Sequence, residues 1–115
     1  MSEPDSLASR PPMGWNSFDA YGTSITEAEV RANAVLMEWR LAPYGWDTLV
    51  VDIQWSEPQA KAGGYNPDAD LAMDAYGRLI PAVNRFPSSQ GGAGFKPLAD
   101  FLHDLGLKFG IHVMR

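Results

Sequence analysis

The 115-residue chain contains no cysteine. Disulfide bridges, thiolate catalysis and cysteine-based metal sites are therefore excluded. The absence of cysteine fits a reducing compartment. The first residues also lack the basic and apolar regions of a secretory signal, so we expect a cytoplasmic protein.

Basic charge is also scarce, with nine Lys and Arg against 14 Asp and Glu, and the net charge is −5. Nucleic-acid binders usually carry a basic stripe, so no nucleic-acid partner is expected. No apolar run approaches the length that spans a bilayer, so no membrane partner is expected. The two histidines fall on different predicted elements, and we expect no metal and no cofactor.

Aromatic residues are abundant, with four Trp, four Tyr and five Phe. Such rings either fill a core or stack on the apolar face of a sugar. Composition alone favours core packing.

The first half of the chain predicts a strand, a helix and a second strand. Residues 1–10 are polar and predict an unstructured lead-in, and residues 13–18 predict a short strand. A capping box at residues 26–29 opens a helix with one apolar face, and residues 43–45 stop it. Residues 47–53 predict the second strand, whose apolar run without alternation is typical of a strand covered on both faces.

The second half begins with a long connection over residues 56–94, which indicates a functional loop. Leu79–Pro81 is a candidate extended piece within it. Pro97 suits the first turn of a second helix and Gly106 its end. A third strand is expected over residues 107–113.

The resulting β-α-β-α-β order predicts an α/β fold with a parallel sheet. A doubly wound sheet and the start of a (β/α)8 barrel both fit this order. The first strand is followed by neither G-x-G-x-x-G nor a Walker A pattern, which weakens a nucleotide-binding or flavodoxin-like sheet.

Polar and aromatic side chains follow each predicted strand. They include Asn16, Ser17, Phe18 and Asp19 after the first, Asp52, Gln54 and Trp55 after the second, and His112, Met114 and Arg115 after the third. In parallel α/β folds the working residues lie at these carboxyl ends. Carboxylates that accept bonds from vicinal hydroxyls, beside aromatic rings, suit a polyhydroxylated ligand.

Several of these residues also have a purely structural interpretation. Asp52 follows a buried apolar run, where an unpaired carboxylate is costly. It is therefore either an acid that binds a ligand, or a structural residue that caps a helix or forms an ion pair with Arg115 or Lys108. Trp15 and His112 are either core residues or pocket residues. The other polar side chains, His103 on the second helix and Glu57, Asp68, Asp70 and Asp74 in the loop, are expected at the surface.

The segments that carry these residues resemble glycoside hydrolase family 27, the α-galactosidase family. Residues 11–17 read PPMGWNS, against P-P-M-G-W-N-S-W in the family, and residues 51–55 read VDIQW against I-D-D-x-W. Further matches follow in order at residues 77–79, 85–87 and 98–103, and residues 106–111 match G-L-K-x-G-I.

The resemblance implies that residues 11–115 are the N-terminal part of a (β/α)8 barrel that hydrolyses terminal α-linked galactose with retention. Both catalytic Asp residues would then lie beyond Arg115, and the isolated chain would be inactive. The resemblance assigns substrate binding to Asp52 and places Phe18 and His112 in the pocket. Trp15 and Trp55, which lie at the strand ends, are the other two substrate-binding residues that we expect.

Three positions in the pocket depart from the family pattern. Phe18 stands in place of a stacking Trp, Ile53 in place of a second Asp, and His112 in place of a Tyr. These departures leave open an α-D-galactoside or a related sugar such as a β-L-arabinopyranoside. The alternative function is a non-catalytic carbohydrate-binding or assembly module, and the sequence does not indicate an oligomeric state.

Overall fold

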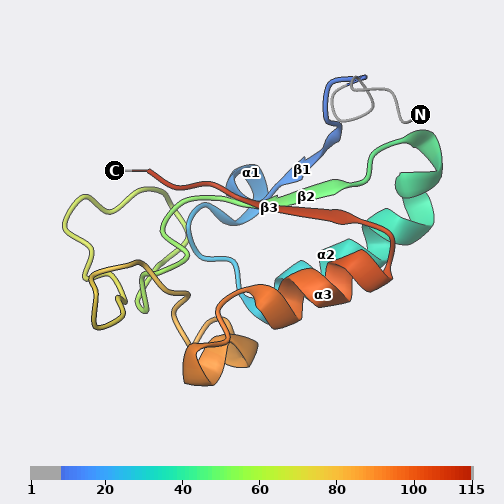
Figure 1. Cartoon of the computed structure of the whole chain (residues 1–115). Helices are drawn as coiled ribbons and strands as arrows, with labels where there is room; N and C mark the ends of the chain where they lie inside the picture. The colour runs from blue at the N-terminus through green and yellow to red at the C-terminus, as the bar shows by residue number, and fades with distance from the viewer. Residues whose placement is uncertain (1–8, 115) are drawn as a thin grey trace.

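The computed structural model of the chain describes residues 9–114 (Figure 1). In this range three parallel strands form one sheet in the order β1–β2–β3. Strand β1 spans Gly14–Asn16, β2 spans Thr48–Val51 and β3 spans Lys108–Ile111. The predicted element order and parallel sheet are confirmed, whereas all but two residues of the predicted lead-in, 1–10, lie outside the described residues.

Helix α2 (Glu27–Arg40) connects β1 to β2 and begins at the predicted capping box. The Glu29 carboxylate accepts a hydrogen bond from the Thr26 N–H at 2.9 Å, and the Glu29 N–H donates to Thr26 Oγ1 at 3.4 Å. The 3₁₀ turn η2 (Ala42–Tyr44) follows, and Gly45 adopts φ 90°, which favours glycine. The predicted stop of this helix is confirmed.

Helix α3 (Lys96–Asp104) leads into β3 and has proline in its first turn, as predicted. Leu98 and Leu102 on this helix are buried in the core, and Gly106, with φ 78°, turns the chain toward β3. Both predicted boundaries of the second helix are therefore confirmed.

Helices α2 and α3 cover the same face of the sheet (Figure 1). Leu49 and Val51 in β2 are fully buried, while Val50, which points to the opposite face, is half-buried. Within residues 9–114 the expected cover of β2 on both faces is found on one face only, the face on which both helices pack. A sheet with helices on one face fits the wall of a barrel, whose other face is the interior.

The first strand is shorter than predicted, because Phe18 begins the one-turn helix α1 (Phe18–Tyr21). Asn16 Oδ1 accepts a hydrogen bond from the Phe18 N–H at 2.8 Å, and the Tyr21 N–H donates to the Ser17 carbonyl at 2.9 Å. These two local bonds turn the chain away from the strand direction. Phe18 therefore lies on a helical turn just beyond the carboxyl end of β1.

The long connection contains little regular structure. Its main elements are an isolated antiparallel bridge between Met73 and Leu79, and the kinked 3₁₀ segment η3 (Pro87–Gly92). The brief extended piece predicted at Leu79–Pro81 is confirmed at Leu79. The connection lies at the carboxyl ends of the strands (Figure 1), where it can shape a ligand site. No helix in residues 9–114 is both long and apolar enough to cross a membrane.

Candidate functional site at the strand ends

The carboxyl ends of the three strands are joined by hydrogen bonds. The hydroxyl of Ser17, which directly follows β1, accepts a bond from the Asp52 N–H at 2.9 Å, and the Ser17 N–H donates to the Val50 carbonyl at 3.0 Å. The His112 N–H, directly after β3, donates to the Val51 carbonyl at 2.9 Å. The side chains at the three strand ends are therefore held in a fixed register.

The Asp52 carboxylate pairs with the His112 imidazole. Asp52 Oδ1 lies 2.8 Å from His112 Nδ1 and also accepts the Ile53 N–H at 2.6 Å. The Asp52 side chain is 12% exposed and the His112 side chain 52%. The partner of Asp52 is therefore His112; Lys108 forms no ion pair with it, and Arg115 lies outside the described residues.

Both members of this pair belong to the uncovered face of the sheet. Val50 in β2 is in register with Gly110 in β3, and alternate residues of a strand point to the same face. Asp52 and His112 each follow two residues later, so they extend the face that the helices leave open. In a barrel this face is the interior, where a substrate binds at the carboxyl ends of the strands.

Trp55 is buried and contacts the backbone of His112. Its side chain is 5% exposed, its indole N–H donates to the His112 carbonyl at 3.0 Å, and its ring meets Phe95 edge-on at 5.1 Å. Trp55 also borders a small pocket of about 70 Å³. The pocket's other lining residues include Ile53, Gln54, Tyr65, Leu79, His112 and Met114.

The structure brings three of the five predicted binding residues together, namely Asp52, His112 and Trp55. Trp15 is in register with Leu49, half-buried against the helix-covered face, and its ring meets Tyr21 edge-on at 6.0 Å. Phe18 is half-buried at the start of α1, beside the carboxyl end of β1.

Arg85 is a buried residue whose role the sequence analysis did not predict. Its Nη1 donates to the carbonyls of Gln54 at 2.7 Å and Glu57 at 2.9 Å, and its Nη2 donates to the carbonyls of Thr23 and Ile25. Burial lowers the pKa of Arg85 to about 10, so the guanidinium remains charged at neutral pH. One side chain thus ties the segment after β1 to the segment after β2.

The segment after β2 is held more firmly than its sequence indicates. Glu57, expected at the surface, is only 4% exposed, and its Oε1 accepts a bond from Asn66 Nδ2 at 2.9 Å. The Gln54 side-chain amide bonds both the carbonyl and the N–H of Asn66. The expected exposure of Glu57 is wrong because partners distant in sequence, Asn66 and Arg85, enclose it.

The Asp52 carboxylate keeps one oxygen without a partner among the described residues. No cluster of three or more His, Asp or Glu side chains that could hold a metal occurs within residues 9–114. Within the same residues, nothing bonds the second oxygen of Asp52, Oδ2. A carboxylate oxygen of this kind is a strong acceptor for a hydroxyl group.

Comparison with known proteins places this geometry among sugar hydrolases, although no family model matches the chain. The chain is 35% identical to an α-galactosidase of Cyamopsis tetragonoloba over 92% of its own length and 22% of the relative's. It is 63% identical to the crystal structure of a family GH27 β-L-arabinopyranosidase from Geobacillus stearothermophilus, with a TM-score of 0.90, and covers 25% of that chain. A D197A variant of that enzyme was solved in complex with arabinose.

A more distant structure agrees on the fold. The α-galactosidase I of Mortierella vinacea is 27% identical, with a TM-score of 0.71 over 95% of this chain and 23% of that one. The chain therefore spans about a quarter of the length of these three proteins, and its three strands are a portion of their barrel.

Proposed function

Because the chain belongs to glycoside hydrolase family 27, as a portion of the family's barrel, we propose that it forms part of the sugar-binding wall of a retaining glycosidase. The substrates are terminal α-D-galactosyl or closely related residues. One observation carries the proposal: Asp52 and His112 are joined at the open face of the sheet, with Asp52 Oδ2 unbonded among the described residues.

A retaining glycosidase uses two carboxyl groups about 5–5.5 Å apart, one as the nucleophile and one as the acid and then the base. We assign neither role to Asp52. Its Oδ1 is already committed to His112 and the Ile53 N–H, which suits a group that orients sugar hydroxyls. Both catalytic Asp residues are predicted beyond Arg115.

A β-L-arabinopyranoside is a second candidate substrate, favoured by Ile53. Ile53 is 7% exposed and borders the small pocket. Its polar contact with Asp52 is made by the backbone N–H and not by the side chain. An apolar side chain offers no acceptor for a further hydroxyl. The 63% identity to an arabinopyranosidase supports this candidate.

We test the proposal in a whole barrel. In this chimaera, residues 11–114 of the present chain replace the matched part of the G. stearothermophilus arabinopyranosidase, and we call the chimaera the completed barrel. We expect it to hydrolyse p-nitrophenyl β-L-arabinopyranoside or α-D-galactopyranoside, with the unaltered arabinopyranosidase as control. A completed barrel that unfolds cooperatively but hydrolyses neither substrate would contradict the proposal.

Ile53→Asp then examines the choice of sugar. The new carboxylate adds an acceptor, and we expect the ratio of kcat/KM for the galactoside to that for the arabinopyranoside to rise about tenfold or more. Ile53→Val, which keeps the apolar character, should leave that ratio within about threefold. An unchanged ratio in Ile53→Asp would remove Ile53 as a determinant of the sugar.

A further inference from the structure

His112 is held at three points although half of its side chain is exposed. Its N–H donates to the Val51 carbonyl at 2.9 Å, and its carbonyl accepts the Trp55 indole N–H at 3.0 Å. Its Nδ1 lies 2.8 Å from Asp52 Oδ1. The first two contacts fix the main chain of His112, and the contact with Asp52 Oδ1 fixes the orientation of its ring.

The contact with Asp52 selects one tautomer of the ring. A carboxylate has no proton to donate, so the hydrogen of this bond belongs to His112 Nδ1. In the neutral imidazole the other nitrogen, Nε2, is then an acceptor. No residue within 9–114 bonds Nε2, and His112 is one of the residues that line the small pocket.

The same contact divides the two oxygens of Asp52. Oδ1 accepts from both the Ile53 N–H and His112 Nδ1, which fixes the carboxylate plane, while Oδ2 has no bond within the described residues. Asp52 and His112 follow strands β2 and β3, which are directly paired. Two acceptors, Asp52 Oδ2 and His112 Nε2, are therefore left on neighbouring strand ends.

We propose that His112 is the positioning residue for Asp52, and that Asp52 Oδ2 and His112 Nε2 together accept hydrogen bonds from two neighbouring hydroxyl groups of a sugar. This inference rests on the proposed function and specifies its recognition chemistry. Without the Nδ1–H the carboxylate would keep only the Ile53 N–H and could rotate. The vicinal diol of a pyranose matches such a pair of acceptors.

The first test observes the tautomer directly, without any turnover. Histidine-¹⁵N spectra of the chain, recorded at about pH 8 where histidine is mainly neutral, should show the Nδ1–H form for His112. His103, exposed on α3, is the internal reference, and Asp52→Ala should return His112 toward the Nε2–H form. An Nε2–H form of His112 in the folded parent chain overturns the inference.

The second test separates the two nitrogens in the completed barrel. His112→Phe removes both nitrogens, whereas His112→Asn keeps a donor near the place of Nδ1. We expect His112→Phe to raise KM about 10- to 100-fold with little change in kcat, and His112→Asn to raise it several-fold less.

The Asp52→Ala background is the control for this comparison. In this background the side-chain amide of the His112→Asn variant has no carboxylate to position. The His112→Asn and His112→Phe variants should therefore have equal KM values. Equal KM values for the two variants in the presence of Asp52 would overturn the positioning role. If the completed barrel hydrolyses neither sugar while the parent chain shows the Nδ1–H form, the proposed function fails and the positioning contact stands.

Discussion

At the scale of single residues, the site depends on contacts between side chains far apart in sequence. The positions of Asp52 and His112 after strands were predicted from the sequence. The ion-pair partner considered for Asp52, however, was Lys108 or Arg115. Sequence neighbours could not reveal the pair because it forms only when β2 and β3 align. The burial of Glu57 escaped prediction for the same reason.

Asp52→Ala measures the role of this carboxylate in the completed barrel. We expect transition-state binding, calculated from the ratio of kcat/KM values, to weaken by about 2–4 kcal/mol. The reason is that sugar hydroxyls lose a charged acceptor and stay unpaired. Asp100→Ala is the control, since Asp100 is exposed on α3 and, among the described residues, pairs only with Lys96. An unchanged kcat/KM in Asp52→Ala would refute its assignment to the sugar.

At the scale of elements, the sequence was most informative where local chemistry decides the structure. The boundaries of α2 and α3 were predicted from a capping box, two prolines and two glycines, all of which act within a few residues. The first strand was predicted too long because the Asn16 side chain starts the turn of α1. Cross-links such as that of Arg85 to four carbonyls have no local signal.

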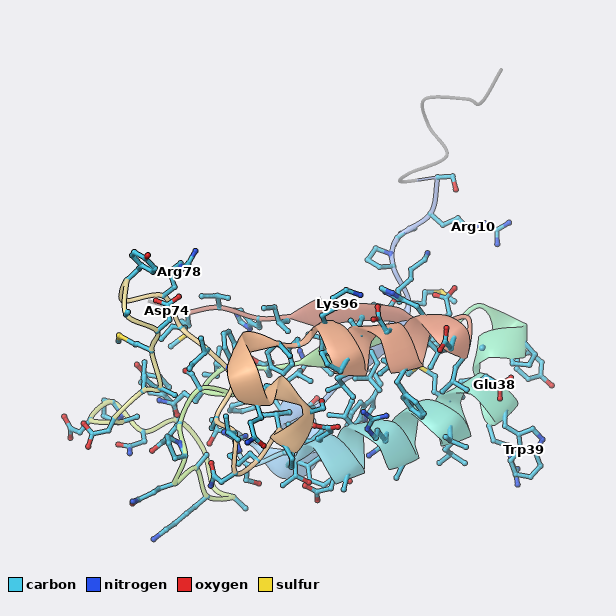
Figure 2. The ribbon with its side chains drawn as sticks, turned by 60° about the horizontal axis from the view of Figure 1, so that its bottom comes forward. Arg10, Glu38, Trp39, Asp74, Arg78 and Lys96 are labelled. Atoms are coloured by element: carbon cyan, nitrogen blue, oxygen red, sulfur yellow. The ribbon has the colours of Figure 1, made fainter. Side chains whose placement is uncertain are left out.

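Arg85→Met tests how strongly this cross-link holds the segments after β1 and β2. The carbonyls of Thr23 and Ile25 would lose their donor, and those of Gln54 and Glu57 would lose one of two donors. We therefore expect the free energy of unfolding to fall by about 3 kcal/mol or more. Arg78→Met is the control, because the Arg78–Asp74 pair lies exposed in the long connection (Figure 2) and should contribute little to the free energy of unfolding. Chemical denaturation of the completed barrel gives both values, and equal losses would contradict the role of Arg85.

At the scale of the whole molecule, the described residues form a sheet with an uncovered face and two unpaired edges, on β1 and β3. Apolar side chains on α2 are also exposed, among them Trp39, which points away from the body of the molecule (Figure 2). The barrel, left open by the element order alone, was predicted through motif resemblance and is confirmed by the structural relatives. The division into residues 1–10 and 11–115 and the cytoplasmic location stay predictions.

The purified 115-residue chain is expected to show no glycosidase turnover. Open sheet edges and an incomplete pocket leave the sugar with one wall, and such edges favour association with other chains. The measurement is release of p-nitrophenol from the two p-nitrophenyl glycosides, with the completed barrel as the positive control. Turnover by the isolated chain, after contaminating enzyme is removed, would refute this prediction.

The hydrogen bond that the Ser17 hydroxyl accepts from the Asp52 N–H constrains how the three strands can be aligned. Since hydrogen bonds join the ends of β1, β2 and β3, sliding any strand by a single residue would separate Asp52 from its partners. If the proposed function holds, affinity for a sugar therefore also reports whether the three strands keep their register.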